Sequence, residues 1–301
     1  MGITPGLPGR AEDFINESER NATPAEDVGK GVKLEDNGKF SEKFIRDRQE
    51  FIFDESGTFT VPDWGDELIV EVWGAGGSGG AGAFGGNDVR LAAAGGAGGQ
   101  YANIRLPKGV FNHNDTVSVT IGAGGAAVTG AGDRNTGNTG GATSFGDFLS
   151  VTGAPGGGTN SSDTFPTTTN NTTGAKSSTS TDDDVETIIL VNARGAFGGG
   201  ASASSSTAEA TNGQSREKLS GGGGGAAHNG GIGNFDSGDG GTSIEAGNGG
   251  NGASQSANAT AQAGTNPGGG GGGAVCRTGT ATSGAGGNGR VKVTVIGKIG
   301  V

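Results

Sequence analysis

Few side chains in this sequence have the chemistry that a catalytic or metal site needs. The 301 residues include two histidines and one cysteine. His113 lies in the run Asn112-His113-Asn114-Asp115, which is typical of a turn, so we expect a solvated surface residue. Cys276 has no local partner that would support a catalytic thiolate. A single cysteine also excludes an intrachain disulfide framework.

The remaining motifs point to no defined reaction. GxGxxG recurs through composition alone, and no GxxxxGK[ST] phosphate loop is present. Residues 230–239 resemble a calcium-binding glycine-rich turn, but the aspartate comes one residue late and no tandem copy follows. Two interpretations therefore stay open for the segment around Asp236: a calcium site and a solvated loop. No carboxylate pair has the context of a glycosidase. We expect a protein that is not an enzyme and needs no cofactor or metal.

The composition sets two opposite expectations. Glycine contributes 69 residues and proline 8, about a quarter of the chain, and the net charge is −11. Such values alone are typical of low-complexity, disordered chains. The apolar residues, however, alternate in short runs such as Leu68, Val70 and Val72, which is the pattern of half-buried strands. We therefore expect core-forming strands separated by glycine-rich tracts.

The same figures exclude several classes of partner. An acidic chain lacks the basic patches that nucleic acid requires. No apolar run reaches the length of a membrane-spanning helix, so we expect no membrane insertion. Residues 1–15 show no basic start followed by an apolar stretch, so no secretory signal is visible.

The alternating runs predict an all-β fold with a small, sandwich-like antiparallel framework. Two of its strands form a tight hairpin around Gly146-Asp147, and residues 153–183 form a polar excursion. The expected strands are Phe51–Phe53, Thr58–Val61, Glu67–Trp73, Gln100–Leu106, Thr116–Ile121, Ala142–Phe145, Phe148–Thr152, Glu186–Val191 and Arg290–Ile296.

Three interpretations compete for the glycine tracts, at least eight of which start near positions 74, 95, 122, 153, 198, 221, 247 and 268. Flexible linkers are the usual outcome of Gly/Ser composition. Collagen is excluded, because glycine keeps no strict third-residue period and proline is scarce. Packed polyglycine II helices are the third interpretation and the one we favour. Their backbones can approach closely and hydrogen-bond to one another, which offsets the entropy of ordering glycine.

The first fifty residues differ from the rest and define a separate segment. We divide the chain into an N-terminal attachment segment, 1–50, and a glycine-rich domain, 51–301. Asn37-Gly38 is a strong hairpin signal. The segment is either a linker with one turn or a device that docks onto a neighbouring subunit. The candidate assembly residues are Val32, Leu34, Phe40, Phe44 and Ile45.

Apolar or ring-bearing side chains isolated in polar loops are candidates for surface binding. Exposed aromatic rings bury a large area on contact and lose few rotamers. The candidates are Phe165, Phe197, His228, Phe235 and Ile244. Local packing between glycine tracts is the alternative for Phe197 and Ile244.

The order of several blocks resembles a known family. Phe59-Thr60-Val61-Pro62 is followed by Val70–Gly77 (VEVWGAGG), and GGAGGQYA, VSVTIGAGG, GGATSF and GGNGRVKVTV come later in the same order. This arrangement, over residues 57–296, resembles the glycine-rich domain of phage tail fibres and adhesins. The resemblance implies a β-framework that supports polyglycine II helices and a tip whose variable loops bind a host surface. The insert 153–183 and the stretch 198–289 depart from many members.

The expected function is therefore a structural appendage protein, a phage-type tail-fibre or adhesin subunit that attaches to a host cell-surface receptor. It would reside in the virion or on an extracellular appendage, contact other structural proteins of that particle, and form a homo-oligomer, a trimer if it is a fibre. The alternative is a cellular extracellular filament or matrix protein that polymerises through its N-terminal segment.

Overall fold

The computed structural model describes residues 47–83, 91–161, 188–193, 201–203, 208–215, 220–229 and 234–297. These residues form an all-β protein, as the alternating runs predict. None of them belongs to a helix that is long and apolar enough to cross a bilayer. The hairpin predicted at Asn37-Gly38 lies outside the described residues.

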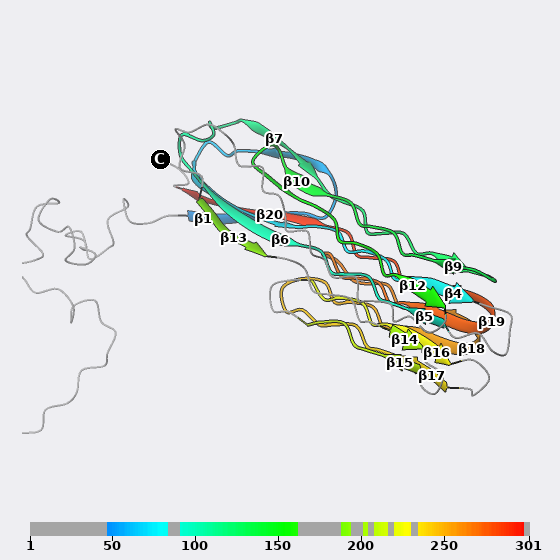
Figure 1. Ribbon diagram of the computed structural model, residues 1–301. Helices are drawn as coiled ribbons and strands as arrows, with labels where there is room; N and C mark the ends of the chain where they lie inside the picture. The colour runs from blue at the N-terminus through cyan, green and yellow to red at the C-terminus, as the bar shows by residue number, and fades with distance from the viewer. Residues whose placement is uncertain are drawn as a thin grey trace, which may run out of the picture.

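One end of the molecule, the sandwich end, consists of two sheets (Figure 1). The strand order is β1-β20-β3-β6-β13 in one sheet and β11-β10-β7-β2 in the other, with antiparallel neighbours throughout. The strands are β1 (Asp47–Phe53), β2 (Gly57–Thr60), β3 (Gly65–Trp73), β6 (Tyr101–Pro107), β7 (Thr116–Thr120), β10 (Thr143–Phe145), β11 (Leu149–Val151), β13 (Ile188–Ala193) and β20 (Arg290–Gly297). The predicted sandwich and its β10–β11 hairpin are confirmed.

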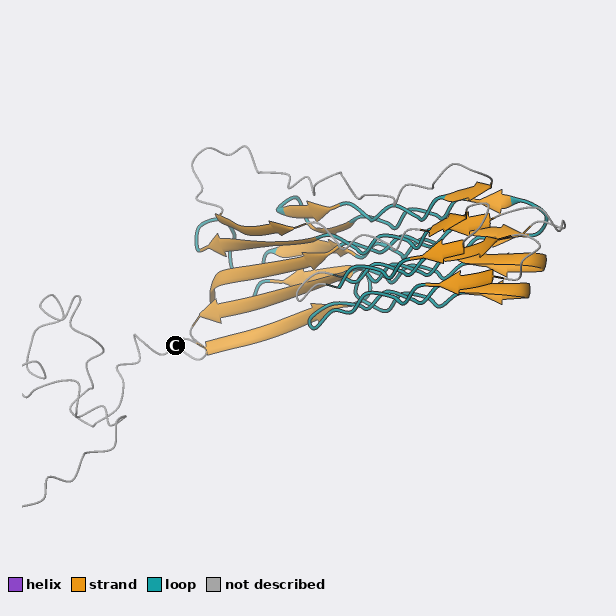
Figure 2. Ribbon diagram, turned by 60° about the horizontal axis from the view of Figure 1, so that its bottom comes forward, coloured by secondary structure: helices purple, strands orange, loops and turns teal. Residues whose placement is uncertain are grey.

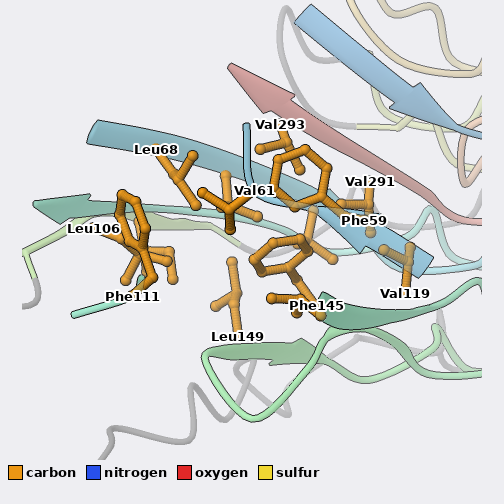
Figure 3. Close-up of a cluster of buried hydrophobic side chains, with 14 of the residues drawn as sticks. Phe59, Val61, Leu68, Leu106, Phe111, Val119, Phe145, Leu149, Val291 and Val293 are labelled. Carbon is orange, nitrogen blue, oxygen red and sulfur yellow. The ribbon is translucent and has the colours of Figure 1, made fainter. Parts of the chain in front are cut away.

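Side chains from both sheets form the core of the sandwich (Figure 3). Phe59 and Phe145 face each other with ring centroids 5.7 Å apart, and both are almost fully buried. Leu68 and the valines of β3, together with the alternating valines of β20, are buried in the same cluster. The two-residue period of the sequence therefore decides which face of each strand is buried.

Glycine-rich tracts leave the sandwich side by side and run toward the opposite end (Figure 2). In tract 74–80, every third backbone amide donates to the same neighbour, tract 94–100. These bonds, 2.8 to 3.0 Å long, run from Gly74, Gly77 and Gly80 to Gln100, Ala97 and Ala94. The period is three residues, whereas a strand would return to the same neighbour every second residue.

A three-residue period gives one tract many neighbours. Each residue has one amide and one carbonyl, so three residues can bond in six directions. Tract 74–80 uses all six, donating to three neighbours and accepting from three others. It donates to tracts 94–100, 136–142 and 283–289, and it accepts from tracts 122–128, 152–158 and 268–274.

Tract 268–273 is a second inner tract. Its backbone is hydrogen-bonded to tracts 74–80, 94–100, 220–225, 247–252, 261–265 and 283–289. The longest glycine run of the sequence thus lies where the backbone is surrounded on every side.

Close approach of neighbouring backbones explains why these positions are glycine. A Cβ atom on Gly76 would lie 2.2 Å from the carbonyl oxygen of Gly269, and one on Gly79 would lie 2.0 Å from that of Gly272. Real Cβ atoms essentially never come that close, so the inner tracts tolerate a side chain only where it points into a gap.

Outer tracts complete their hydrogen bonding with side chains. The amide of Gly124 donates to Oδ1 of Asn288 at 2.9 Å, and the amide of Gly240 donates to Oδ1 of Asn251 at 2.8 Å. Val128 N donates to Oγ of Ser283 at 2.9 Å. Asparagine and serine oxygens therefore replace carbonyl oxygens as acceptors, which gives the polar residues among the glycines a structural role.

The tracts end in a second group of strands, most of them short, which we call the far end (Figure 1). These strands were not predicted. Their sheets are ordered β12-β5-β16-β17, β14-β15 and β18-β19-β4-β9, with β8 paired to β19. The strands are β4 (Ala81–Ala83), β5 (Leu91–Ala93), β8 (Thr129–Gly130), β9 (Arg134–Asn135), β12 (Thr159–Ser161), β14 (Ala201–Ala203), β15 (Ala208–Ala210), β16 (Ala226–Asn229), β17 (Asn234–Ser237), β18 (Ala253–Thr260) and β19 (Ala274–Thr282).

Alanine forms the core of the far end. Ala81, Ala83, Ala274 and Cys276 are almost fully buried in one cluster. Such small side chains permit the close spacing that the tracts impose, but they lack the apolar alternation by which strands are recognised in a sequence. The β-framework is thus divided into two groups of sheets, one at each end of the bundle of glycine tracts.

Tyr101 lies where tract 94–100 enters β6. Its hydroxyl donates to Oε1 of Glu71 at 2.8 Å, its ring lies against Trp73, and its side chain is buried. Burial, followed by the hydrogen bond to and charge of Glu71, raises the pKa of Tyr101 well above its usual value.

Tyr101 is the only tyrosine in the chain, so its titration is directly visible in tyrosinate absorbance. A raised pKa means that the folded state holds the proton more tightly. The stability this contributes is complete below a pH of about 10, the unfolded pKa, and is lost as the pH rises above it. We expect tyrosinate to appear only together with unfolding, and Tyr101→Phe to reduce the loss of Tm between pH 9 and 11. Reversible titration near pH 10 in folded protein would contradict this.

Candidate binding surface

The far end exposes two places where the chain reverses. Tracts 268–273 and 283–289 are antiparallel, so the chain turns back within β19, where Gly279 has φ +88°. Asn258 in β18 has φ +41°, and its Oδ1 accepts from Thr280 N at 2.9 Å. The hydrogen bond between the two reversals thus stabilises the positive φ of Asn258, which residues other than glycine rarely adopt. Gln255 to Asn258 and Thr278 are exposed beside them.

A third reversal forms the wall of an open depression. Between β8 and β9, Ala131 N donates to Oδ1 of Asp133 at 2.8 Å, and Gly132 has φ +86°. The depression has a volume of about 530 Å³ and is lined by Gly132, Asp133, Arg134, Thr136 and Thr159. Its lining offers hydroxyl, carboxylate and guanidinium groups, the set that hydrogen-bonds to polyhydroxylated ligands.

Arg134 is the cation among the residues that line this depression. It is exposed, and no carboxylate of the described residues forms an ion pair with it. Asp133, its neighbour, instead bonds to Ala131 N and, more weakly, to Nδ2 of Asn135 at 3.4 Å. In a chain of net charge −11, a guanidinium that remains available for a ligand favours an anionic or hydroxyl-rich partner.

The structure brings together two of the predicted binding residues and separates a third. His228 and Phe235 are partners in the β16–β17 register at the far end, and Phe235 is half-buried. Ile244 is 81% exposed, but it lies in the bend 244–246 at the other end of tract 238–242. Gly247, directly after that bend, donates to the carbonyl oxygen of Pro267, and the carbonyl oxygen of Gly268 accepts from Gly99, two residues before β6, so the bend lies toward the sandwich end.

The other predicted residues lie outside the described residues. These are Phe165 and Phe197 of the binding set and Val32, Leu34, Phe40, Phe44 and Ile45 of the assembly set. The predicted boundary at residue 50 falls inside β1, which starts at Asp47.

Cys276, His113 and Asp236 each lie in surroundings that explain them without catalysis or metal binding. Cys276 is buried in β19, and this burial raises the pKa of its thiol. His113 is exposed in its turn, with Nε2 3.0 Å from the carbonyl oxygen of Gly65. Asp236 accepts a hydrogen bond from Ala210 N at 2.6 Å. Across the described parts of the chain, no three His, Cys, Asp or Glu side chains gather as metal ligands would.

Sequence reasoning missed Arg134, Thr136, Thr159 and Asn258. The run Ala131-Gly132-Asp133 is a turn signal that could have located the β8–β9 reversal. No comparable signal marks Asn258, because its backbone conformation depends on β19.

Sandwich, hydrogen-bonded glycine bundle and polar reversals together define an all-β glycine-rich domain. A family model described as a glycine-rich domain matches residues 54–295, and the chain belongs to this family. No curated protein matches the sequence.

Proposed function

We propose that the glycine tracts are polyglycine II helices packed into a stiff rod. The three-residue hydrogen-bond period supports this, because the left-handed helix has three residues per turn and no internal hydrogen bonds. Backbone ¹⁵N relaxation of the full chain should give order parameters of about 0.85 for residues 220–225 and 247–252, as in rigid backbone. Low order parameters, typical of nanosecond motion, would contradict the rod and would indicate strands joined by flexible tethers.

The function that this architecture supports best is that of a structural appendage, a phage-type tail-fibre or adhesin subunit that attaches to a host cell surface. The observation that carries the proposal is the polarity of the domain. β1, which follows the N-terminal segment, pairs with the last described strand at the sandwich end, while three exposed reversals lie at the far end. One end is thus suited to attachment and the other to presenting a polar surface.

Binding of isolated surface polysaccharides tests the attachment function. The full chain is immobilised and exposed to a panel of bacterial lipopolysaccharides and capsular polysaccharides. We expect binding to at least one of them, and at least a tenfold weakening in Arg134→Ala, corresponding to about 1.4 kcal/mol. Lys108→Ala is the matched control, because Lys108 is an exposed cation at the sandwich end, paired with Asp66. No binding across the panel, or equal loss in both variants, would contradict the proposal.

Electron microscopy of the same material separates the attachment function from the filament alternative. A fibre subunit gives discrete particles, whereas a cellular filament protein gives long polymers of the purified chain. Polymers that disappear on deletion of residues 1–46 would favour the filament.

A further inference from the structure

The five-stranded sheet of the sandwich ends in an edge strand with an unpaired side. β1 pairs with β20 over all seven residues from Asp47 to Phe53. From Arg48 to Phe53, the side of β1 that faces away from β20 has no backbone partner within the described part of the chain. Residues 48–50 are exposed, and so is Ile52, at 56%. Such an edge is a template for a further strand.

β1 also differs from the other edges of the sandwich. The facing sheet ends in β2, with four residues, and β11, with three. β13, at the opposite edge of the five-stranded sheet, is interrupted by an irregularity between Ile189 and Val191. Short strands and irregularities are ways in which proteins protect edges from pairing, and β1 has neither.

The charged side chains of β1 are complementary to those of a second β1 strand when the two strands pair antiparallel. Arg48 and Glu50 lie on the same face of the strand, 2.6 Å apart, with 62% and 43% of their side chains exposed. If two β1 strands pair antiparallel about Gln49, Arg48 of each copy lies opposite Glu50 of the other. Parallel pairing in register would instead set arginine against arginine. Opposite charges across a strand pair stabilise it, and like charges destabilise it.

We propose that two copies of this chain associate edge to edge through antiparallel pairing of β1 about Gln49. The five-stranded sheets of the two copies then form one continuous sheet. A two-fold axis through Gln49 makes the interface isologous, and the far ends of the two copies point in opposite directions. This proposal does not depend on which ligand the far end binds, since the pairing involves only β1 at the sandwich end.

Charge reversal provides the test, with sedimentation of the full chain as the measurement. We expect Arg48→Glu and Glu50→Arg each to weaken dimerisation about tenfold or more, because each sets like charges opposite one another at two points. Mixing the two variants in equal amounts should restore the dimer, and so should the double variant Arg48→Glu/Glu50→Arg. Both side chains are exposed, so an unchanged far-UV circular dichroism spectrum checks that each variant is folded.

A crosslink tests the register itself. In Gln49→Cys, the two introduced thiols face each other on the axis at a Cα separation suited to a disulfide, about 4.5–5.5 Å. We expect rapid oxidation to a covalent dimer, and little crosslinking in the control Lys108→Cys. Cys276 is buried and should not compete. A monomeric wild-type chain, single reversals that associate as tightly as wild type, or a trimer insensitive to all these variants would overturn the proposal.

Discussion

Alanine at Gly157 should destabilise the protein severely, whereas alanine at the adjacent Gly158 should not. A Cβ atom on Gly157 would lie 1.9 Å from the carbonyl oxygen of Ala94 and 3.0 Å from the amide of Gly80. Both obstacles are backbone atoms of other tracts, so relief requires whole tracts to move apart. Overpacking of a well-packed core typically costs about 1–3 kcal/mol, and we expect at least the upper value here.

Gly158 is a matched control because it belongs to the same tract. A Cβ atom there meets nothing within 4 Å. Replacing such a glycine by alanine reduces the entropy of the unfolded chain and typically stabilises a protein by about 0.4–1 kcal/mol. The measurement is Tm by calorimetry for both variants. Equal melting temperatures would show that the tracts are not packed as closely as described.

The second large effect is expected at Phe145 in the sandwich core. The ring is completely buried on β10, against Phe59 (Figure 3). Its centroid lies 6.1 Å from that of the Phe148 ring. Phe145→Ala removes most of the side chain from a site between two sheets, so we expect a loss of about 3–5 kcal/mol.

Phe148→Ala is the control for this prediction. Phe148 packs at the margin of the same cluster and is partly exposed, so a smaller loss is expected. Both tryptophans, Trp64 and Trp73, lie at the sandwich end, so their fluorescence during urea unfolding reports on this part of the molecule. A loss at Phe145 no larger than that at Phe148 would contradict the assignment of the core.

The sandwich was predictable because its strands carry large apolar residues with a two-residue period. Val291 and Val293, for example, alternate with Arg290, Lys292 and Thr294 and are both fully buried. The observed β3 and β20 extend the predicted strands by one or two residues. In such segments the hydrophobic effect acts locally, so the sequence alone shows which face is buried.

The far end was not predictable on the same grounds. Ala274 and Ala81 form part of a core because inner tracts bring their strands together, and alanine carries little information about burial. The candidate binding surface could not be predicted for the same reason, because it too depends on contacts between segments that are distant in the sequence. Arg134 is exposed beside a depression because β4 and β9 pair there, a contact between residues about fifty positions apart.

The six-neighbour bundle constrains how the length of this protein can change. Inserting one residue into an inner tract would turn every later residue of that tract by about 120°, so that each amide would meet the wrong neighbour. Only an addition of three residues, made in every adjoining tract together, preserves the pairing. We therefore expect a bundle with this three-residue period to change length in whole repeats, and single insertions and deletions to be tolerated in the connections at its two ends.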